Sequence, residues 1–336
     1  MPFRSRKTRW GLAALGALVA FALGGWANPP NILDPHGPEA LKESNLFWFI
    51  LVVATIIFVA VMSVLLYSIV RFRARPGMPV PRQLHGNNKL EIAWTVVPSI
   101  VLLLVLFMTI STMFSLAQPT GVPTMTVRAI GHQWWWEFQY PDQHIVTADE
   151  LHVPTNMVVH VELYSNNVIH SFWIPQLSGK TDVIPGHDNT MWFSSDKTGV
   201  YRGECAEFCG TQHAHMNFEV VVDSPGVYAT WLAGQQAPAA KPTSALALQG
   251  QQAFRQCSGC HYIQGVDPFS TTQIGPNLTH FGSRNLIAGG VLVNNKANLA
   301  MWLKDPQAVK SGSDMPNLGL TQAQIDALVA YLESLK

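Results

Sequence analysis

Two short segments hold all four cysteines of the chain. In the first, Cys205, Cys209, His213 and Met216 follow one another closely. Thiolate, imidazole and thioether groups bind soft transition metals, and the thioether favours copper over zinc. The second segment reads Cys257-Ser-Gly-Cys260-His261, the spacing at which two thioethers hold a haem and the adjacent histidine faces its iron. Two redox sites on one chain predict electron transfer.

The haem-attachment motif needs a second axial ligand, and a methionine paired with the histidine raises the reduction potential. Met315 is the first candidate, since it lies in Asp-Met-Pro, where a turn before the last expected helix can project it. Met301 is the alternative, in an apolar helical stretch that we expect to pack in the core. A redox dithiol or half of a zinc site would also use Cys-x-x-Cys, but a helical domain in an exported chain argues against both.

The first cysteine segment lacks one nitrogen ligand, which must come from another loop. Two cysteines and one histidine would also suit tetrahedral zinc if a second histidine joined them. His170, in Asn-Asn-Val-Ile-His-Ser-Phe-Trp, follows an expected strand and is the first candidate. The weaker candidates are His132, His152, His160 and His187. His215 is expected to face away from the site.

Two uncharged stretches, 46–70 and 92–117, each exceed the roughly 20 residues that span a bilayer as a helix. The segment between them carries several arginines and lysines, and positively charged loops stay in the cytoplasm. The sequence therefore predicts a transmembrane hairpin in the bacterial inner membrane, with the C-terminal domains on the periplasmic side. Residues 1–27 have the basic start, apolar stretch and small-x-small end of a signal peptide, with a retained membrane helix as the alternative.

The composition agrees with a membrane protein, because 48% of the residues are hydrophobic and only 12% are charged. The formal net charge is zero, but residues 122–224 carry four basic and twelve acidic side chains, a balance of −8. Such a surface attracts a basic partner and raises its encounter rate. The sequence has no basic run of the kind that marks nucleic-acid binding, which argues against that class of partner.

The chain is expected to be a multidomain membrane protein with three further segments after the hairpin. Residues 122–224 contain short β-branched or aromatic runs between Gly, Pro, Asn and Asp, which predicts an all-β sandwich or small barrel. These runs are 126–130, 158–164, 190–194 and 217–222. Residues 233–245 have the composition of a linker. Residues 246–336 are expected to be all-α, ending in a helix over 321–335 with Thr321 as its N-cap.

At this point the chain resembles subunit II of the haem–copper cytochrome c oxidases, in the variety with a cytochrome c domain fused at the C-terminus. The resemblance covers nearly all of the chain after the signal segment. It rests on the two hydrophobic stretches, the cysteine loop and four short motifs: Glu91-x-x-Trp94-Thr-Val-Val-Pro98, Gly131-His-Gln-Trp-Trp-Trp136, His170-Ser and Lys180-Thr-Asp182.

The resemblance implies a cupredoxin fold that holds a dinuclear copper centre, CuA. Two cysteines would bridge the coppers, two histidines would cap them, and a thioether and a backbone carbonyl would complete the set. In this sequence these are Cys205, Cys209, His170, His213, Met216 and the carbonyl of Glu207. In the cytochrome c domain, Cys257 and Cys260 would attach the haem, and His261 and Met315 would be its axial ligands.

Three further roles also follow from the resemblance. The side chain of Glu207 would reach a magnesium ion at the interface with the catalytic subunit. Trp134 would be the surface residue through which electrons enter the copper domain. Glu91 would lie at the cytoplasmic end of a proton path. The family often has an acid three residues before the capping histidine, where this chain has Asn167. A tethered donor has less need of charge steering, because a short linker gives an effective concentration on the order of millimolar.

The uncharged stretches contain no histidine, so oxygen reduction must occur on another subunit. The expected partners are oxidase subunit I, subunit III of the proton-pumping complex, and an external donor such as a c-type cytochrome or a cytochrome bc complex. Two alternatives remain open. The chain could be the CuA and haem c subunit of a nitric oxide reductase, although Glu91 and the 180–182 segment favour the oxidase. It could also be a membrane-anchored copper-binding or assembly protein, which the haem motif, Met216 and the tryptophan stretch disfavour.

Overall fold

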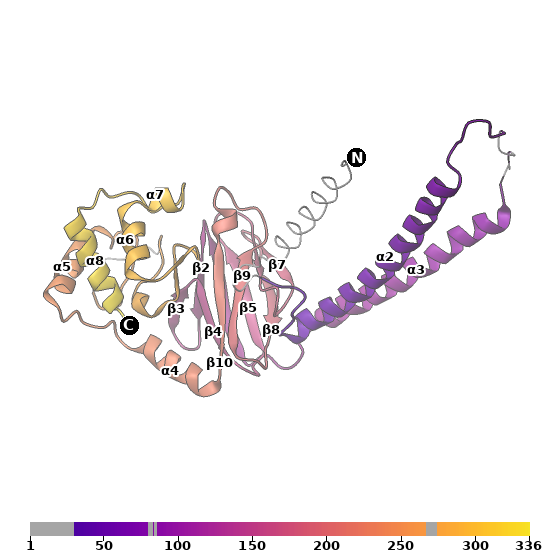
Figure 1. Cartoon of the computed structure of the whole chain (residues 1–336). Helices are drawn as coiled ribbons and strands as arrows, with labels where there is room; N and C mark the ends of the chain where they lie inside the picture. The colour runs from indigo at the N-terminus through magenta and orange to yellow at the C-terminus, as the bar shows by residue number, and fades with distance from the viewer. Residues whose placement is uncertain (1–29, 80–82, 84–85, 267–273) are drawn as a thin grey trace.

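The computed structural model describes residues 30–79, 83, 86–266 and 274–336. The expected signal peptide, 1–27, lies outside the described residues. A helical hairpin, a β-sandwich and a helical domain follow one another along the chain. The hairpin and the helical domain lie at opposite ends of the sandwich (Figure 1).

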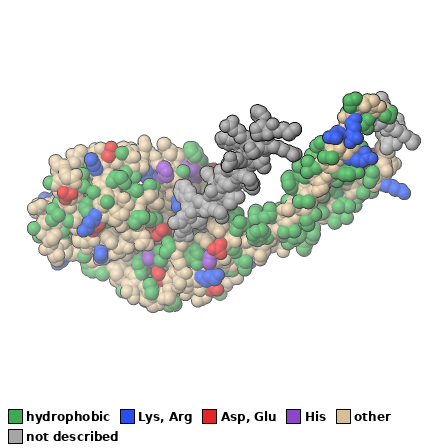
Figure 2. Space-filling model, viewed as in Figure 1, with side chains coloured by type: hydrophobic (Ala, Val, Ile, Leu, Met, Phe, Trp, Pro, Cys, Tyr) green, Lys and Arg blue, Asp and Glu red, His purple; other side chains and the backbone are tan. Residues whose placement is uncertain are grey.

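The hairpin consists of α2 (Pro38–Arg71) and α3 (Asn88–Leu116), both long and apolar enough to cross a membrane. Figure 2 shows hydrophobic side chains along the hairpin and basic side chains near its far end. α2 begins before the uncharged stretch, because Pro38 suits the first turn of a helix and the preceding Gly37 N–H donates to Gln176 O of the sandwich. The Asn87 side chain caps α3 by accepting from the amides of Lys89 and Leu90.

Two five-stranded sheets form the sandwich. The first has the order β3 (Ile145–Ala148), β2 (Trp135–Tyr140), β1 (Met125–His132), β5 (Val159–Ser165) and β8 (Asn189–Phe193). The second has the order β4 (Glu150–Pro154), β10 (Asn217–Asp223), β9 (Gly199–Cys205), β6 (His170–Trp173) and β7 (Lys180–Val183). β1 pairs with β5, and β4 with β10, in parallel, whereas the other pairs are antiparallel.

The sandwich core is aromatic. The rings of Trp136, Phe138, Phe172 and Phe218 are fully buried and contact one another edge-on or stacked across the two sheets. Side chains alternate between buried and more exposed positions along β1, β5 and β9, as expected for strands with one face on a core. The four strands expected from the β-branched runs are β1, β5, β8 and β10, and all four are confirmed.

The chain leaves the sandwich through α4 (Pro225–Gln236). This helix takes up the start of the segment 233–245 that had linker composition, because Tyr228, Trp231 and Leu232 pack on the sandwich core and hold it there. An irregular connection over 237–244 then leads to Ser244, whose side chain caps the next helix.

The helical domain contains α5 (Ala245–Ala253), α6 (Lys296–Lys304), α7 (Pro306–Val309) and α8 (Gln322–Ser334). The last helix is confirmed with its N-cap: Thr321 and Gln324 form a capping box. One small element was not expected in this domain, the strand pair β11 (Leu286–Ile287) and β12 (Leu292–Val293). Single turns of 3-10 helix, η1 (His213–His215), η2 (Phe254–Gln256) and η3 (Phe281–Ser283), complete the elements.

Candidate copper and haem sites

The side chains of the first cysteine segment meet His170 at one end of the sandwich. Cys205 Sγ lies 3.7 Å from Cys209 Sγ and 3.8 Å from His170 Nδ1. Cys209 Sγ lies 3.7 Å from His213 Nδ1 and 3.8 Å from Met216 Sδ. The Glu207 carbonyl is 3.3 Å from Cys205 Sγ. Each sulfur thus has one histidine beside it, an arrangement that fits two soft metal ions sharing two thiolates.

The strand register explains why a distant histidine joins this loop. β6 and β9 are neighbours, with Phe172 opposite Cys205, so His170 at the start of β6 lies beside the end of β9. The Asn167 side-chain oxygen is 3.1 Å from His170 Nε2 and can accept its N–H. That hydrogen bond leaves Nδ1, the atom facing Cys205, free to bind a metal. The sequence suggested only that Asn167 replaces an acidic residue that helps a donor to dock in related proteins.

The two thiols are free and buried, and they titrate as a pair. The hydrogen bond between the sulfurs lowers the pKa of Cys205 and raises the pKa of Cys209. The physical cause is that one proton between two sulfurs stabilises the first thiolate and opposes the second. A cation held between them is what would allow both thiolates to form.

In the described part of the chain, neither the weaker histidine candidates nor His215 belong to this group of donors. His152 Nδ1 is 2.9 Å from Asp223 Oδ2, and its ring stacks on Trp231. His132 stacks on Trp135. His215 Nδ1 is 2.6 Å from Gln212 Oε1. Among the described residues, His170, Cys205 and Cys209 are the only group of at least three histidine, cysteine or acidic side chains whose donor atoms lie close enough together to hold a metal ion.

The second cysteine segment borders a cavity that the helical domain lines together with a few residues of the sandwich, called here the haem cavity. It is lined by Cys257, Cys260, His261 and Met315 together with apolar side chains. Those apolar residues include Phe254, Leu278, Phe281, Ile287, Leu299 and Leu303, which also belong to the hydrophobic core of the domain. A cavity with an apolar wall, two thiols and two possible axial ligands fits a covalently attached haem.

The ring of His261 is oriented by the backbone. His261 Nδ1 lies 2.9 Å from the carbonyl of Pro276, so that Nδ1–H donates and Nε2 is left as the metal-binding atom. Burial lowers the pKa of His261, which favours the neutral ring that binds iron. Met315 lines the same cavity, whereas Met301 is exposed on α6 and is not among the lining residues. The expectation that Met301 packs in the core is wrong, because Leu299 and Leu303 occupy the buried face of α6.

Trp134 lies between the two sites rather than at an open surface. Its indole Nε1 donates to the Cys209 carbonyl at 3.0 Å, and Gln133 Nε2 donates to the same oxygen at 2.7 Å. Both residues also line the haem cavity. Trp134 is buried, so the expectation of a surface position is wrong: the C-terminal domain covers it.

Glu207 and Glu91 are not among the residues that line the haem cavity. The Glu207 residue is exposed on the cysteine loop, beside Phe208, which is 75% exposed. Glu91 is in the first turn of α3, where its carboxylate accepts from the Asn87 amide at 3.2 Å. This contact gives Glu91 a capping role in the helix itself.

Comparisons with known proteins agree with this division of the chain. Three family descriptions match: "Cytochrome C oxidase subunit II, transmembrane domain" over residues 30–112, "Cytochrome C oxidase subunit II, periplasmic domain" over 125–163 and 145–224, and "Cytochrome c" over 247–336. The chain thus has two transmembrane helices and a periplasmic copper-binding domain, followed by a cytochrome c domain, and these domains imply copper and haem c as cofactors.

Curated relatives match over most of their length. Cytochrome c oxidase subunit 2 of Alkalihalophilus pseudofirmus is 38% identical over 90% of both chains, and that of a Bacillus species is 38% identical over 97% of this chain and 98% of its own. A crystal structure of the periplasmic domain of subunit II of cytochrome oxidase from Bradyrhizobium japonicum is 32% identical over 34% of this chain and 96% of that chain, with a TM-score of 0.34. The chain belongs to the cytochrome c oxidase subunit II family, carries its own cytochrome c domain, and transfers electrons to a terminal oxidase.

Proposed function

We propose that electrons from an external donor reach the cytochrome c domain, pass by way of Trp134 to the copper domain, and continue to the catalytic subunit. The observation that carries this order is the double contact of Trp134. Its ring lines the haem cavity, and its Nε1 donates to the carbonyl of Cys209 in the copper loop. When bound, haem c and the copper pair supply reversible one-electron chemistry, and the residues of the chain fix where each is held.

The proposed copper ligands are the six groups gathered around the two sulfurs. Cys205 and Cys209 would bridge two ions, with one histidine Nδ1 beside each sulfur. The Met216 thioether and the Glu207 carbonyl would complete the set. Sharing two thiolates spreads the change of charge over several atoms, which should lower the reorganisation that accompanies each electron. The buried position of the sulfurs keeps water away from them.

In the cytochrome c domain, Cys257 and Cys260 would hold the haem covalently, and His261 and Met315 would bind its iron. The hydrogen bond from His261 to the Pro276 carbonyl supports the assignment of His261, because it occupies Nδ1 and leaves Nε2 as the ring nitrogen that could bind iron. The position of Met315 on the wall of the haem cavity supports the assignment of Met315.

The expected partners follow from the absence of histidine in the described membrane helices and from the exposed side chain of Glu207. Described helices α2 and α3 contain no histidine, so oxygen chemistry would lie on subunit I, with subunit III beside it. The exposed Glu207 side chain would reach a magnesium ion at the interface with subunit I. Glu91, on the first turn of α3, would open a proton path. A c-type cytochrome or a cytochrome bc complex would supply electrons to the cytochrome c domain.

The first experiment is a spectrum of the purified, metal-replete protein. The proposal predicts a near-infrared band of a mixed-valence copper pair together with reduced haem c bands. Absence of both would overturn it. Co-purification with a chain that consumes oxygen separates an oxidase from a nitric oxide reductase.

The second experiment tests the route through Trp134 with a Trp134→Phe variant of the complete oxidase. A photoreductant delivers electrons to the cytochrome c domain, and the near-infrared band reports their arrival in the copper domain. We expect slower arrival with both spectra unchanged. Trp231→Phe is the control, because Trp231 stacks on His152 and is not among the residues that line the haem cavity. Equal rates in Trp134→Phe and wild type would mean that electrons take another route.

A further inference from the structure

One lysine of the cytochrome c domain is buried in its contact with the copper domain. Lys310 is only 2% exposed, and its Nζ donates to the carbonyls of Trp134 (2.6 Å), His215 (2.7 Å) and Ala288 (2.9 Å). The first two carbonyls belong to the copper domain and the third to the cytochrome c domain. An ammonium has three donors, and a buried one is tolerated when all are bonded, as here.

The three carbonyls lie next to both redox sites. His215 directly precedes Met216, and Trp134 contacts the carbonyl of Cys209. Lys310 itself lines the haem cavity together with His261 and Met315. A single side chain therefore touches the backbone of the copper loop, the tryptophan between the sites and the wall of the haem cavity.

Backbone contacts around Lys310 shape the same interface. The Asn217 amide, at the start of β10, donates to the Gly289 carbonyl at 3.0 Å. Gly289 and Gly290 have φ of 69° and 76°, and a Cβ on Gly289 would lie 2.5 Å from the Trp134 carbonyl. Glycine is required where the backbone approaches this closely. On the other side of Lys310, the Gln212 side chain donates to the Ser311 carbonyl at 2.6 Å.

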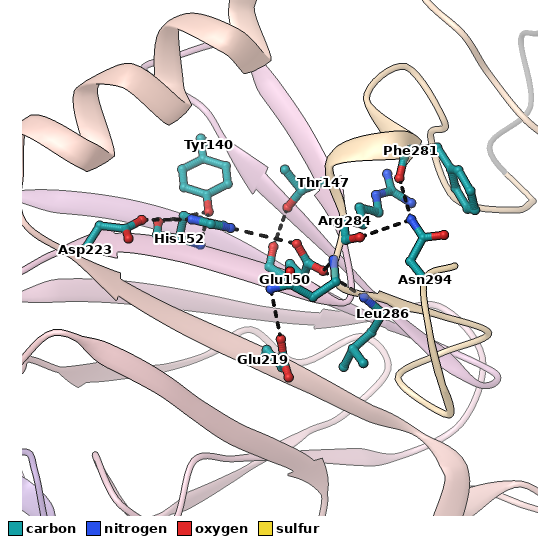
Figure 3. Close-up of polar contacts among 11 residues, drawn as sticks. Tyr140, Thr147, Glu150, His152, Glu219, Asp223, Phe281, Arg284, Leu286 and Asn294 are labelled. Carbon is teal, nitrogen blue, oxygen red and sulfur yellow. Dashed lines mark hydrogen bonds and ion pairs between the residues drawn. The ribbon is translucent and has the colours of Figure 1, made fainter. Parts of the chain in front are cut away.

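A second group of contacts extends the interface along β4. The Glu150 carboxylate accepts from the amides of Asn285 and Leu286, the latter at 3.1 Å, and Arg284 lies nearby (Figure 3). The copper domain thus presents the acids Asp149, Glu150 and Glu219, and the cytochrome c domain presents Arg284 and Lys310. Burial lowers the pKa of Lys310 to about 8, and the nearby Asp149 carboxylate opposes this shift.

We propose that Lys310 is a positioning residue for electron transfer between the two domains: it holds the cytochrome c domain docked on the copper domain with Trp134 between the two sites. The inference rests on the proposed route through Trp134. In the step concerned, the cytochrome c domain is oxidised by one electron and the copper domain is reduced by one, with no bond made and no proton moved. Because electron transfer slows steeply with distance, holding the domains in one orientation sets its rate.

The test compares Lys310→Met with Lys304→Met in the complete oxidase. Methionine keeps much of the length of lysine but none of its donors, and Lys304 is an exposed lysine of the same domain. Photoreduction of the cytochrome c domain, followed by the near-infrared band, gives the rate of electron transfer between domains. Hydrogen exchange at the Asn217 and Leu286 amides, which bond across the interface, reports docking.

In Lys310→Met we expect transfer at least about tenfold slower, because three buried carbonyls lose a charged donor and the docked orientation of the two domains is held less firmly. Transfer should not stop, since the linker alone keeps the domains at an effective concentration on the order of millimolar. The two amides should exchange faster, while the haem and copper spectra stay as in wild type. Lys304→Met should match wild type in every measurement.

Two results separate this inference from the proposed function. Fast transfer and protected amides in Lys310→Met would overturn the role of Lys310 and leave the route through Trp134 intact. If electrons in the wild-type oxidase do not pass from the cytochrome c domain to the copper domain, the proposed route itself fails. A loss of the haem or copper spectrum in Lys310→Met would also overturn the inference, because the lysine would then support a site rather than the docking.

Discussion

The copper loop and the haem cavity solve the same problem, holding a redox centre, in different ways. In the copper loop the donor atoms contact one another, and two paired strands and one short loop supply all of them. In the haem cavity the two thiols, His261 and Met315 lie among apolar side chains that also form the domain core. The candidate copper site lies at one end of the sandwich core, whereas the haem cavity is lined by residues of the core of the cytochrome c domain.

This difference teaches which domain depends on its cofactor for folding. The sandwich buries four aromatic rings against one another, those of Trp136, Phe138, Phe172 and Phe218. Trp136 also contacts the ring of His170, so this core reaches the copper donors, but its rings pack on one another without a metal. In the cytochrome c domain, Phe254, Leu278 and Leu299 face the cavity itself, so the haem supplies the surface against which they pack. We therefore expect the copper domain to stay folded without its metal and the cytochrome c domain to need its haem.

The largest expected effect comes from removing haem attachment with Cys257→Ala combined with Cys260→Ala. Without the thioether bonds the haem is lost, and the core residues on the cavity wall lose their packing partner. The cost should approach the whole stability of a small domain, about 5–15 kcal/mol. Hydrogen exchange should show the loss of protection in α5 and α8, while the near-infrared copper band remains. If the amides of α8 exchanged as slowly in the haem-free protein as in wild type, the cytochrome c domain would not need its haem to fold, and the contrast with the copper domain would be wrong.

Replacing Cys205, a proposed bridging ligand, should remove the copper site and leave the sandwich folded. In Cys205→Ser a hydroxyl replaces a thiolate and cannot bridge two soft ions. We expect the near-infrared band to disappear and the copper content per chain to fall, with the circular dichroism of the sandwich unchanged. An unchanged copper content would show that Cys205 does not bridge. Cooperative unfolding of the sandwich on loss of copper would contradict the contrast with the haem cavity.

Sequence motifs were sufficient to predict the residues around each centre, because their chemistry fixes their spacing. The cysteine segments, His170 and the C-terminal helix with its Thr321 cap lie where the spacing and periodicity placed them. The strands of the sandwich with strong β-branched runs were also predicted. Strands such as β6 and β7 were missed, since four residues interrupted by polar side chains carry little periodicity.

What the sequence did not predict is how the two domains meet. Lys310 was one of 21 basic residues, and its burial depends on three carbonyls from segments distant in the chain. Trp134 was expected at the surface because the domain that covers it starts about a hundred residues later. Asn167 was interpreted through charge alone, whereas its contact with His170 arises only when the loop folds back. Such contacts follow from tertiary packing, which leaves no local pattern.

A smaller effect is expected at the weak copper ligand. Met216→Leu replaces a fully buried thioether by a side chain of similar volume, so the stability cost should stay below about 1.5 kcal/mol. Both thiolates and both histidines remain, so copper should be retained. The reduction potential of the copper site should shift, because the weakest ligand tunes it. Redox titration of the near-infrared band measures this, and an unshifted potential would remove Met216 from the ligand set.

The smallest effect should come from Thr321→Ala, which tests whether the stability of the cytochrome c domain responds separately from that of the copper domain. The Thr321 hydroxyl accepts from the Gln324 amide in a capping box, and losing such a cap costs about 1 kcal/mol. Ser224→Ala is the matched control, because Ser224 is the N-cap residue of α4 but makes no side-chain cap hydrogen bond. Thermal unfolding followed at the haem band should show a lower midpoint only in Thr321→Ala, with the copper band unchanged in both variants. If the copper domain lost stability by the same amount, the two domains would unfold as one unit. The difference between the core of the sandwich and the core around the haem cavity would then not determine the stability of each domain.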